Sequence, residues 1–254
     1  MTTNGETGLT EAMRGVLRGE SLTEAEAEAA LERLASGSLD PAAGGAFLAA
    51  LKLKGETTEE IRGFARAMRR LAIRPVVAET QRERAVDVVG TGGDGSGSLN
   101  LSTGSALLAA AAGVPVIKHG NRSVTSRSGS ADVLERLRLP IPLDPAAAGR
   151  CLQRTGFTFL FAPRFHPAMK HVAQVRRALG VRTIFNLLGP LSNPAAPPYH
   201  VIGAWAEGVA ARMADVLGGL PIERAFVVHG APGWDEATPC GPFTLFDVAP
   251  GRVT

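Results

Sequence analysis

Hydrophobic residues between positions 8 and 72 recur at the spacing of amphipathic helices. Thr23 and Glu26 form a capping box, and Thr57 and Glu60 repeat it, so a helix is predicted to begin after each threonine. Helices are predicted over 24–35, 42–53 and 59–71, after a first one that begins near Leu9. We therefore expect a small all-helical domain over residues 1–75.

The pattern changes after residue 85, where short β-branched or aromatic runs alternate with helical segments. Strands are predicted at 86–89, 114–117, 157–161, 200–205 and 225–228, with helices near 105–112, 145–154, 168–179 and 208–217. This alternation is typical of a mainly parallel sheet with helices on its faces. The fold class is thus α/β, with a larger α/β domain over residues 76–254. Residues 242–248 start a strand-rich segment near the end of the sequence, so we expect the sheet to lack its C-terminal part.

A glycine- and serine-rich loop follows the first predicted strand. Six of the nine residues after Gly90 are Gly or Ser, and the loop leads into a predicted helix. Glycines let backbone N–H groups approach an anion, and a helix N-terminus favours negative charge by roughly 0.3–1 kcal/mol. The loop is therefore predicted to bind phosphate, although it has no P-loop lysine. Asp94 would repel a bare phosphate, so we expect it to face a sugar hydroxyl or a metal ion.

A second polar loop runs from Lys118 to Ser130 after another predicted strand. Open α/β sheets bind ligands at the carboxyl ends of their strands, so both loops are predicted to face one anionic ligand. The adjacent Asp235 and Glu236 follow the last predicted parallel strand. Their carboxylate oxygens suit Mg²⁺, and an exposed acidic turn is the alternative interpretation of the same pair.

Composition narrows the class of protein. The 254 residues are 45% apolar, and they contain neither an apolar run long enough to span a membrane nor a secretory signal. The two cysteines are expected to be free thiols, and the protein is expected to be cytoplasmic. The net charge of +3 produces a modest positive field that would attract a polyanionic substrate.

Several motifs, in order, resemble those of the anthranilate phosphoribosyltransferase family of tryptophan biosynthesis. They are Gly90-Thr-Gly-Gly-Asp94, Asn100-Leu-Ser-Thr103, Lys118-His-Gly-Asn-Arg122, Ser128-Gly-Ser-Ala-Asp132 and Asn186-Leu-Leu-Gly-Pro-Leu-Ser-Asn-Pro194. We interpret the last of them as a packing turn. The resemblance implies transfer of the phosphoribosyl group of 5-phosphoribosyl 1-diphosphate (PRPP) to the amine of anthranilate, with release of diphosphate. It also implies a homodimer formed through the helical domain.

The resemblance also implies three groups of site residues. PRPP would contact Gly90, Gly93, Asp94, Ser98, Asn100, Leu101, Ser102, Thr103, Lys118, His119, Gly120, Asn121, Arg122, Ser123, Val124, Thr125, Ser126 and Ser130. Anthranilate would contact Gly90, Asn121 and Arg176, since an arginine pairs with both oxygens of a carboxylate. Mg²⁺ would be held by Ser102, Asp235 and Glu236. No side chain is singled out as an acid, base or nucleophile.

Two other functions are compatible with parts of the pattern. A pyrimidine nucleoside phosphorylase has a similar fold, but it would not need the acidic pair. A non-catalytic nucleic-acid binder would use the basic balance of the chain, but the polar loops carry too few aromatic residues to stack on bases. Turnover of anthranilate rather than thymidine, or salt-dependent DNA binding, would separate these possibilities.

Overall fold

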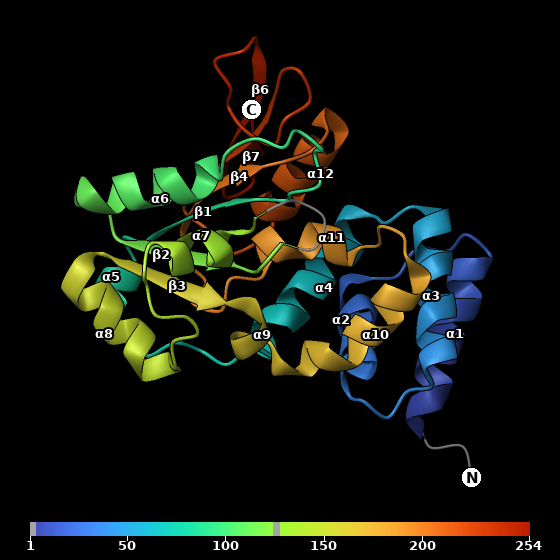
Figure 1. Ribbon diagram of the computed structural model, residues 1–254. Coiled ribbons are helices and arrows are strands. Elements are labelled where there is room, and N and C mark those ends of the chain that lie inside the picture. Colours follow the sequence, from blue (N-terminus) through green and yellow to red (C-terminus); the bar gives the residue numbers. More distant parts are fainter. Residues whose placement is uncertain (1–3, 124–127) are drawn as a thin grey trace. The chain divides into compact units, whose positions relative to one another are not determined.

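The computed structural model describes residues 4–123 and 128–254 (Figure 1). The chain divides into two compact units. The first unit runs up to Ala72 and includes His166–Ser192, and the second consists of Ile73–Phe165 and Asn193–Thr254. The sequence placed everything after residue 75 in one α/β domain, whereas residues 166–192 group with the helices of the first unit.

The first unit is helical throughout its described residues. Its helices are α1 (Asn4–Leu17), α2 (Glu24–Ala35), α3 (Pro41–Lys54), α4 (Thr58–Arg70), α10 (Lys170–Leu179) and α11 (Phe185–Leu188), with 3₁₀ turns at Pro167–Met169 and Gly189–Leu191. Both predicted capping boxes are present, with Thr23 and Thr57 as N-caps. The sequence therefore located the start of α2 correctly and the start of α4 to within one residue.

Buried polar contacts supplement the apolar core of the first unit. Glu60 is fully buried and accepts hydrogen bonds from the backbone N–H groups of Leu22 (2.9 Å) and Thr57 (2.8 Å) and from Lys54 Nζ (2.9 Å). Helices α2 and α4 also approach very closely at Gly63. A Cβ atom there would collide with the carbonyl oxygen of Glu24. Glu60 thus joins α4 to two loops, the one that precedes α2 and the one that precedes α4 itself.

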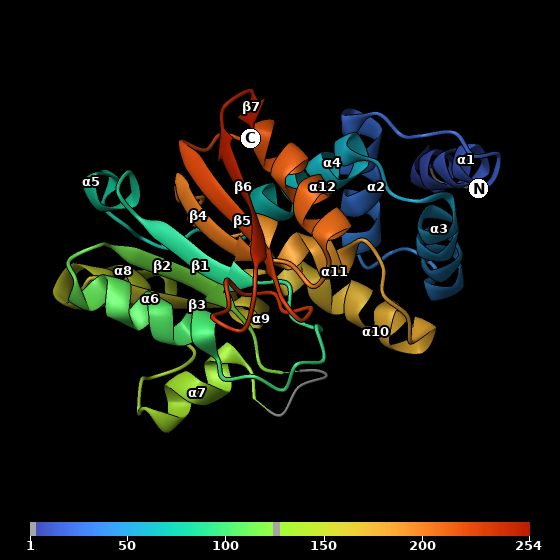
Figure 2. The same ribbon diagram turned by 90° about the horizontal axis from the view of Figure 1, so that it is seen from above.

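The second unit is built on a sheet with the strand order β3-β2-β1-β4-β5-β6-β7 (Figure 2). Its strands are β1 (Val86–Gly90), β2 (Val116–Gly120), β3 (Phe157–Phe161), β4 (Tyr199–Gly203), β5 (Arg224–Gly230), β6 (Phe243–Ala249) and β7 (Arg252–Val253). Strands β1 to β5 pair in parallel, and β6 and β7 are antiparallel. The mainly parallel sheet predicted from the sequence is confirmed.

Helices cover both faces of this sheet, as expected when consecutive strand residues point to opposite sides. The helices of this unit are α5 (Glu79–Arg82), α6 (Leu101–Ala111), α7 (Ser130–Arg136), α8 (Pro145–Thr155), α9 (Ala162–Phe165) and α12 (Glu207–Gly218). Val116 of β2 packs in one core cluster with Ala106 of α6 and Leu134 of α7. The next residue, Ile117, packs in another cluster with Leu152 of α8. Strand β2 begins two residues later than predicted and runs on to Gly120.

Candidate active site

Glycines end the adjacent strands β2, β1 and β4 at their carboxyl ends. Gly90 of β1 is in register with Gly203 of β4, and Gly120 ends the neighbouring β2. The strand order reverses direction between β1 and β4, since β2 and β3 extend to one side and β5 to the other. The crevice at such a reversal is where open α/β sheets bind their ligands. The predicted phosphate loops begin at this point.

The loop after β1 needs its glycines for backbone conformation as well as for space. Gly92, Gly93, Gly95 and Gly97 all have positive φ, between 62° and 74°. This left-handed region is unfavourable for residues that carry a Cβ atom. The loop then enters α6 at Asn100, whose Nδ2 donates to the carbonyl oxygen of Ser128 at 3.3 Å. The structure thus brings the two predicted phosphate loops together.

The acidic pair after β5 lies against the first of these loops. Asp235 Oδ2 accepts a hydrogen bond of 2.7 Å from the backbone N–H of Gly92. Glu236 Oε1 accepts one of 3.3 Å from the N–H of Ser102, in the first turn of α6. Asp94 in turn accepts a bond of 3.4 Å from the N–H of Asp235. Three carboxylates therefore meet at the start of α6, although Asp94 and Asp235 are 141 positions apart in the sequence.

Missing Cβ atoms make this approach possible. A Cβ at Gly90 would collide with the Asp235 carboxylate, and one at Gly203 with the Asp235 carbonyl oxygen. A Cβ at Gly230 would collide with the carbonyl oxygen of Glu236. Each of these glycines ends a parallel strand, so the acidic segment rests directly on the ends of β1, β4 and β5.

The carboxylates of the pair are destabilised in their charged form. Burial raises the pKa of Glu236 to about 7, and the negative charge of Asp235 adds to the effect. Burial also raises the pKa of Asp235, helped by the charge of Asp94. Partly desolvated carboxylates that repel one another suit a divalent cation, which would relieve both effects. Among the described residues, no group of three acidic, His or Cys side chains has the geometry of a complete metal site, so further ligands would have to come from Ser102, substrate or water.

Lys118, the first residue of the second motif, is buried rather than extended into solvent. Its side chain is only 1% exposed, and Nζ donates to the carbonyl oxygen of Val88 and lies 3.4 Å from Ser102 Oγ. Burial lowers its pKa to about 8, against the opposing negative charges of Asp87 and Glu236. Lys118 therefore places a positive charge beneath the start of α6, next to a predicted metal ligand.

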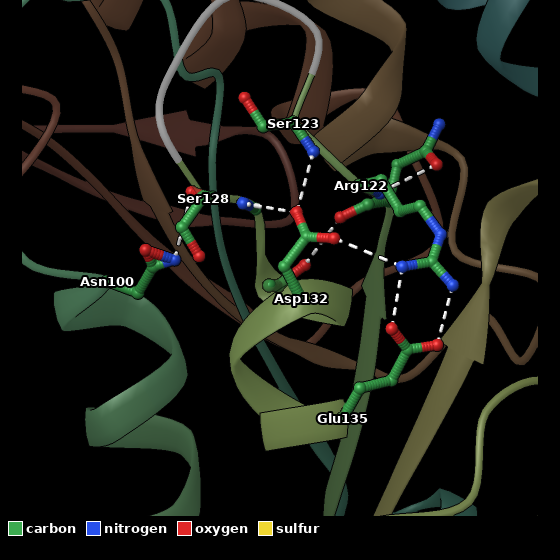
Figure 3. A network of polar contacts seen from close by, with 9 residues as sticks. Asn100, Arg122, Ser123, Ser128, Asp132 and Glu135 are labelled. Atoms are coloured by element: carbon green, nitrogen blue, oxygen red, sulfur yellow. Dashed lines mark hydrogen bonds and ion pairs between the residues drawn. The ribbon is translucent and has the colours of Figure 1, made fainter. Parts of the chain in front are cut away.

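Arg122 is bound to two carboxylates of α7 (Figure 3). Its guanidinium donates to Glu135 through both terminal nitrogens, at 2.6 and 2.5 Å, and to Asp132 Oδ1 at 3.1 Å. Asp132 Oδ2 accepts from the N–H groups of Ser123 (3.2 Å) and Gly129 (2.8 Å). One carboxylate thus joins the two described ends of this loop. The predicted contact of Arg122 with PRPP would require its guanidinium to exchange or share these partners.

The remaining predicted residues are distributed as follows. Thr103 and His119 are buried, and Asn121 is exposed, with its carbonyl oxygen accepting a bond of 3.2 Å from Ser130 Oγ. Gly93, Ser98, Leu101 and Gly120 belong to the second unit with them. Val124, Thr125 and Ser126 lie outside the described residues. Arg176 is in the first unit, on α10, and its guanidinium stacks over Phe185 at 5.3 Å from the ring centroid.

The sequence analysis missed two buried polar residues near the site, Asp87 and Asn193. Asp87 carried a usable signal, because a charged residue inside an otherwise apolar strand has to find a buried partner. Asn193 carried none by itself, since it belongs to the segment interpreted as a packing turn.

Comparisons with known proteins identify the family. The helical bundle domain model of a glycosyl transferase family matches residues 10–72, and the a/b domain model matches residues 82–254. Anthranilate phosphoribosyltransferases from Desulforudis audaxviator and Rubrobacter xylanophilus are each 50% identical over 243 and 245 residues. These alignments cover 96% of this chain and 69% and 70% of the relatives. The chain belongs to the anthranilate phosphoribosyltransferase family.

Solved structures of the family agree with this assignment. The anthranilate phosphoribosyltransferase of Thermus thermophilus is 47% identical and superposes with a TM-score of 0.86, covering 95% of this chain and 71% of that one. The enzyme of Saccharomyces cerevisiae in complex with PRPP and Mg is 28% identical, with a TM-score of 0.87 over 98% of this chain and 72% of that one. No helix in the described ranges is both long and apolar enough to cross a membrane.

Proposed function

We propose that this chain transfers the phosphoribosyl group of PRPP to the amine of anthranilate and releases diphosphate, as a step of tryptophan biosynthesis. The observation that supports it most is the meeting of Gly92, Ser102 and the Asp235–Glu236 pair at the reversal point of the sheet. A nucleoside phosphorylase would need the phosphate loops but not the acidic pair.

The proposed site would act mainly by binding and by electrostatics. The amine of anthranilate is unprotonated near neutral pH, so its attack on the ribose carbon needs no strong base. The difficult event is the departure of diphosphate, whose negative charge grows in the transition state. Backbone N–H groups of the glycine loop and the first turn of α6, together with the buried charge of Lys118, would stabilise that charge.

The same residues fit a divalent cation. Asp235 and Glu236 offer carboxylates whose raised pKa values a cation would lower, and Ser102 adds a hydroxyl beside them. These three residues would hold Mg²⁺, which when bound would neutralise charge on the diphosphate. The complex of the yeast relative with PRPP and Mg supports the choice of this metal.

Anthranilate is proposed to contact Gly90, Asn121 and Arg176, with Arg176 binding its carboxylate. The homodimer is proposed to form through the first unit, where Leu17 of α1 and Leu53 of α3 are 66% and 88% exposed. Light scattering of the purified protein tests the dimer. The cytoplasmic location and the absence of nucleic-acid binding remain parts of this proposal.

The experiment that tests the function follows anthranilate fluorescence after addition of PRPP and Mg²⁺. We expect the fluorescence to fall with enzyme, and to persist when PRPP or Mg²⁺ is omitted. The double variant Asp235→Asn/Glu236→Gln should lose activity by at least 100-fold, whereas Glu83→Gln, at an exposed carboxylate, should keep it. Cleavage of thymidine by phosphate, without consumption of anthranilate, would refute the proposal in favour of a nucleoside phosphorylase.

A further inference from the structure

Asp87 is a fully buried carboxylate and the second residue of β1, and the proposed reaction does not use it directly. Burying a carboxylate is costly unless hydrogen bonds replace the lost water. Replacing such a group with an apolar residue is often neutral or stabilising, so its presence is weak evidence for a purely structural role. The contacts that Asp87 makes are therefore informative.

Two groups donate to the Asp87 carboxylate from other parts of the second unit. The backbone N–H of His119 in β2 donates to Oδ1 at 3.2 Å, and Asn193 Nδ2 donates to Oδ2 at 2.8 Å. Asn193 is also fully buried, and its Nδ2 donates to the carbonyl oxygen of Ile117 at 2.8 Å. Its own Oδ1 accepts from the N–H of Ala195 at 2.9 Å. Asp87 and Asn193 together thus contact the backbone of β2 on both sides of Lys118.

Lys118 makes the reciprocal contact from β2 to β1. The ladder pairs Val86 with Val116, so Val88 stands opposite Lys118, and Lys118 Nζ donates to the Val88 carbonyl oxygen. The Asp87 side chain therefore holds the backbone of β2, while the Lys118 side chain holds the backbone of β1. The ammonium group reaches Ser102 Oγ, 3.4 Å away, at the start of α6. Position along β2 decides where this charge lies.

We infer that Asp87 and Asn193 are positioning residues, which hold β2 in place so that the Lys118 ammonium lies beneath the diphosphate-binding end of α6. This inference rests on the proposed function. Segment 186–194, interpreted from the sequence as a packing turn, then also supports the phosphate site through Asn193. Removing either residue should let the Lys118 charge move without removing it.

The test is a double-mutant cycle between Asn193 and Lys118, measured on the complete chain. Asn193→Ala should raise the KM for PRPP at least tenfold and leave the KM for anthranilate within twofold. Lys118→Met should do the same by itself. If Asn193 acts through Lys118, then adding Asn193→Ala to Lys118→Met should change the KM for PRPP by less than twofold. Asp87→Asn replaces the charged acceptor with an amide of the same shape, and should reproduce the effect of Asn193→Ala.

Two controls make the outcome decisive. Leu217→Ala, at a buried position of α12, should lower stability to urea without changing the KM for PRPP. Asn193→Ser keeps a hydrogen-bond donor, and should restore part of the PRPP affinity lost in Asn193→Ala. If Asn193→Ala does not fold, Asn193→Ser and Asp87→Asn replace it in the cycle. Additive effects in the cycle, or folded Asn193 and Asp87 variants with unchanged KM for PRPP, would overturn the inference. A wild-type protein that neither consumes anthranilate nor binds diphosphate with Mg²⁺ would instead refute the proposed function.

Discussion

The carbonyl oxygen of Asp235 lies where a Cβ atom at Gly203 would have to stand. The end of β4 and the backbone of the acidic segment are therefore in direct contact, with no side chain between them. A residue larger than glycine at position 203 would have to displace the segment that carries both proposed metal ligands.

We predict that Gly203→Ala lowers activity by at least about 100-fold, since a displacement of roughly 1 Å at a reacting site costs that much. The loss should appear mainly as weaker binding of Mg²⁺ and PRPP, so that steady-state kinetics require higher concentrations of both. Gly208→Ala is the matched control, because a Cβ there meets nothing within 4 Å and the residue lies in α12. The control should gain about 0.5–1 kcal/mol of stability. Full activity in Gly203→Ala would contradict the assignment of the acidic segment.

Arg176 is predicted to select anthranilate and to have no part in binding PRPP. Arg176→Ala should raise the KM for anthranilate strongly, because the substrate carboxylate would lose a bidentate partner. Isothermal titration with PRPP and Mg²⁺ should show nearly unchanged affinity. The neighbouring exposed Arg177→Ala provides the control. Equal loss of affinity for both substrates would reject this role.

Asp132 and Glu135 both bind Arg122, but only Asp132 also accepts hydrogen bonds from Ser123 and Gly129. Asp132→Ala should therefore raise the KM for PRPP by about tenfold, since one tenfold step corresponds to about 1.4 kcal/mol, the scale of two lost backbone hydrogen bonds. Glu135→Ala removes only an exposed ion pair and should change stability by less than about 1 kcal/mol. Kinetics and urea unfolding of the two variants side by side make the comparison. Identical behaviour would show that the backbone contacts of Asp132 do not matter.

Glu60 is predicted to be one of the main determinants of stability in the first unit. Glu60→Ala would leave the N–H groups of Leu22 and Thr57 without their acceptor and Lys54 without its carboxylate partner, which should cost about 3–5 kcal/mol. Glu59→Ala, at the adjacent exposed position, should stay within about 0.5 kcal/mol of wild type. Urea denaturation followed by circular dichroism measures both changes. Comparable small effects would mean that the buried network contributes little.

Acid should destabilise the first unit through His166. Burial lowers the pKa of His166 to about 4, against the opposing effect of hydrogen bonds with the backbone of Ser192 and Met68. An unfolded histidine titrates near pH 6.5, so below that pH the unfolded state binds a proton that the native state excludes. Stability present above about pH 6.5 is therefore lost as the pH falls to about 4, by about 3 kcal/mol in total. Urea unfolding across this range should show that the free energy of unfolding falls less with pH in His166→Gln than in the exposed-site control His171→Gln.

Much of the fold could be predicted because it follows from local patterns. Capping boxes at Thr23 and Thr57 marked helix starts, and short β-branched or aromatic runs marked the parallel strands. The grouping of α10 with the first unit could not be predicted, because an amphipathic pattern shows that a face is buried but not which helices bury it.

The sequence also indicated segments that the structure brings together at the candidate site. Glycine content and acidic character indicated the two loops and the Asp235–Glu236 pair. The pairing of Asp87 with Asn193 joins residues 106 positions apart, and a single sequence carries no information on such a contact. The ion pairs of Arg122 were missed for a related reason, since its charge predicted an anionic partner without saying whether that partner was substrate or protein.

Asn100 illustrates a conflict between robustness and function. As the N-cap of α6 it would ordinarily accept a hydrogen bond from its own helix, but among the described residues its side chain makes no such bond and donates to Ser128 instead. The first amide groups of α6 stay available to Glu236 and, as proposed, to substrate. A residue at this position that capped the helix better would occupy those amides and add about 1 kcal/mol of stability. A thermal-shift selection would therefore enrich variants that are more stable but turn over more slowly.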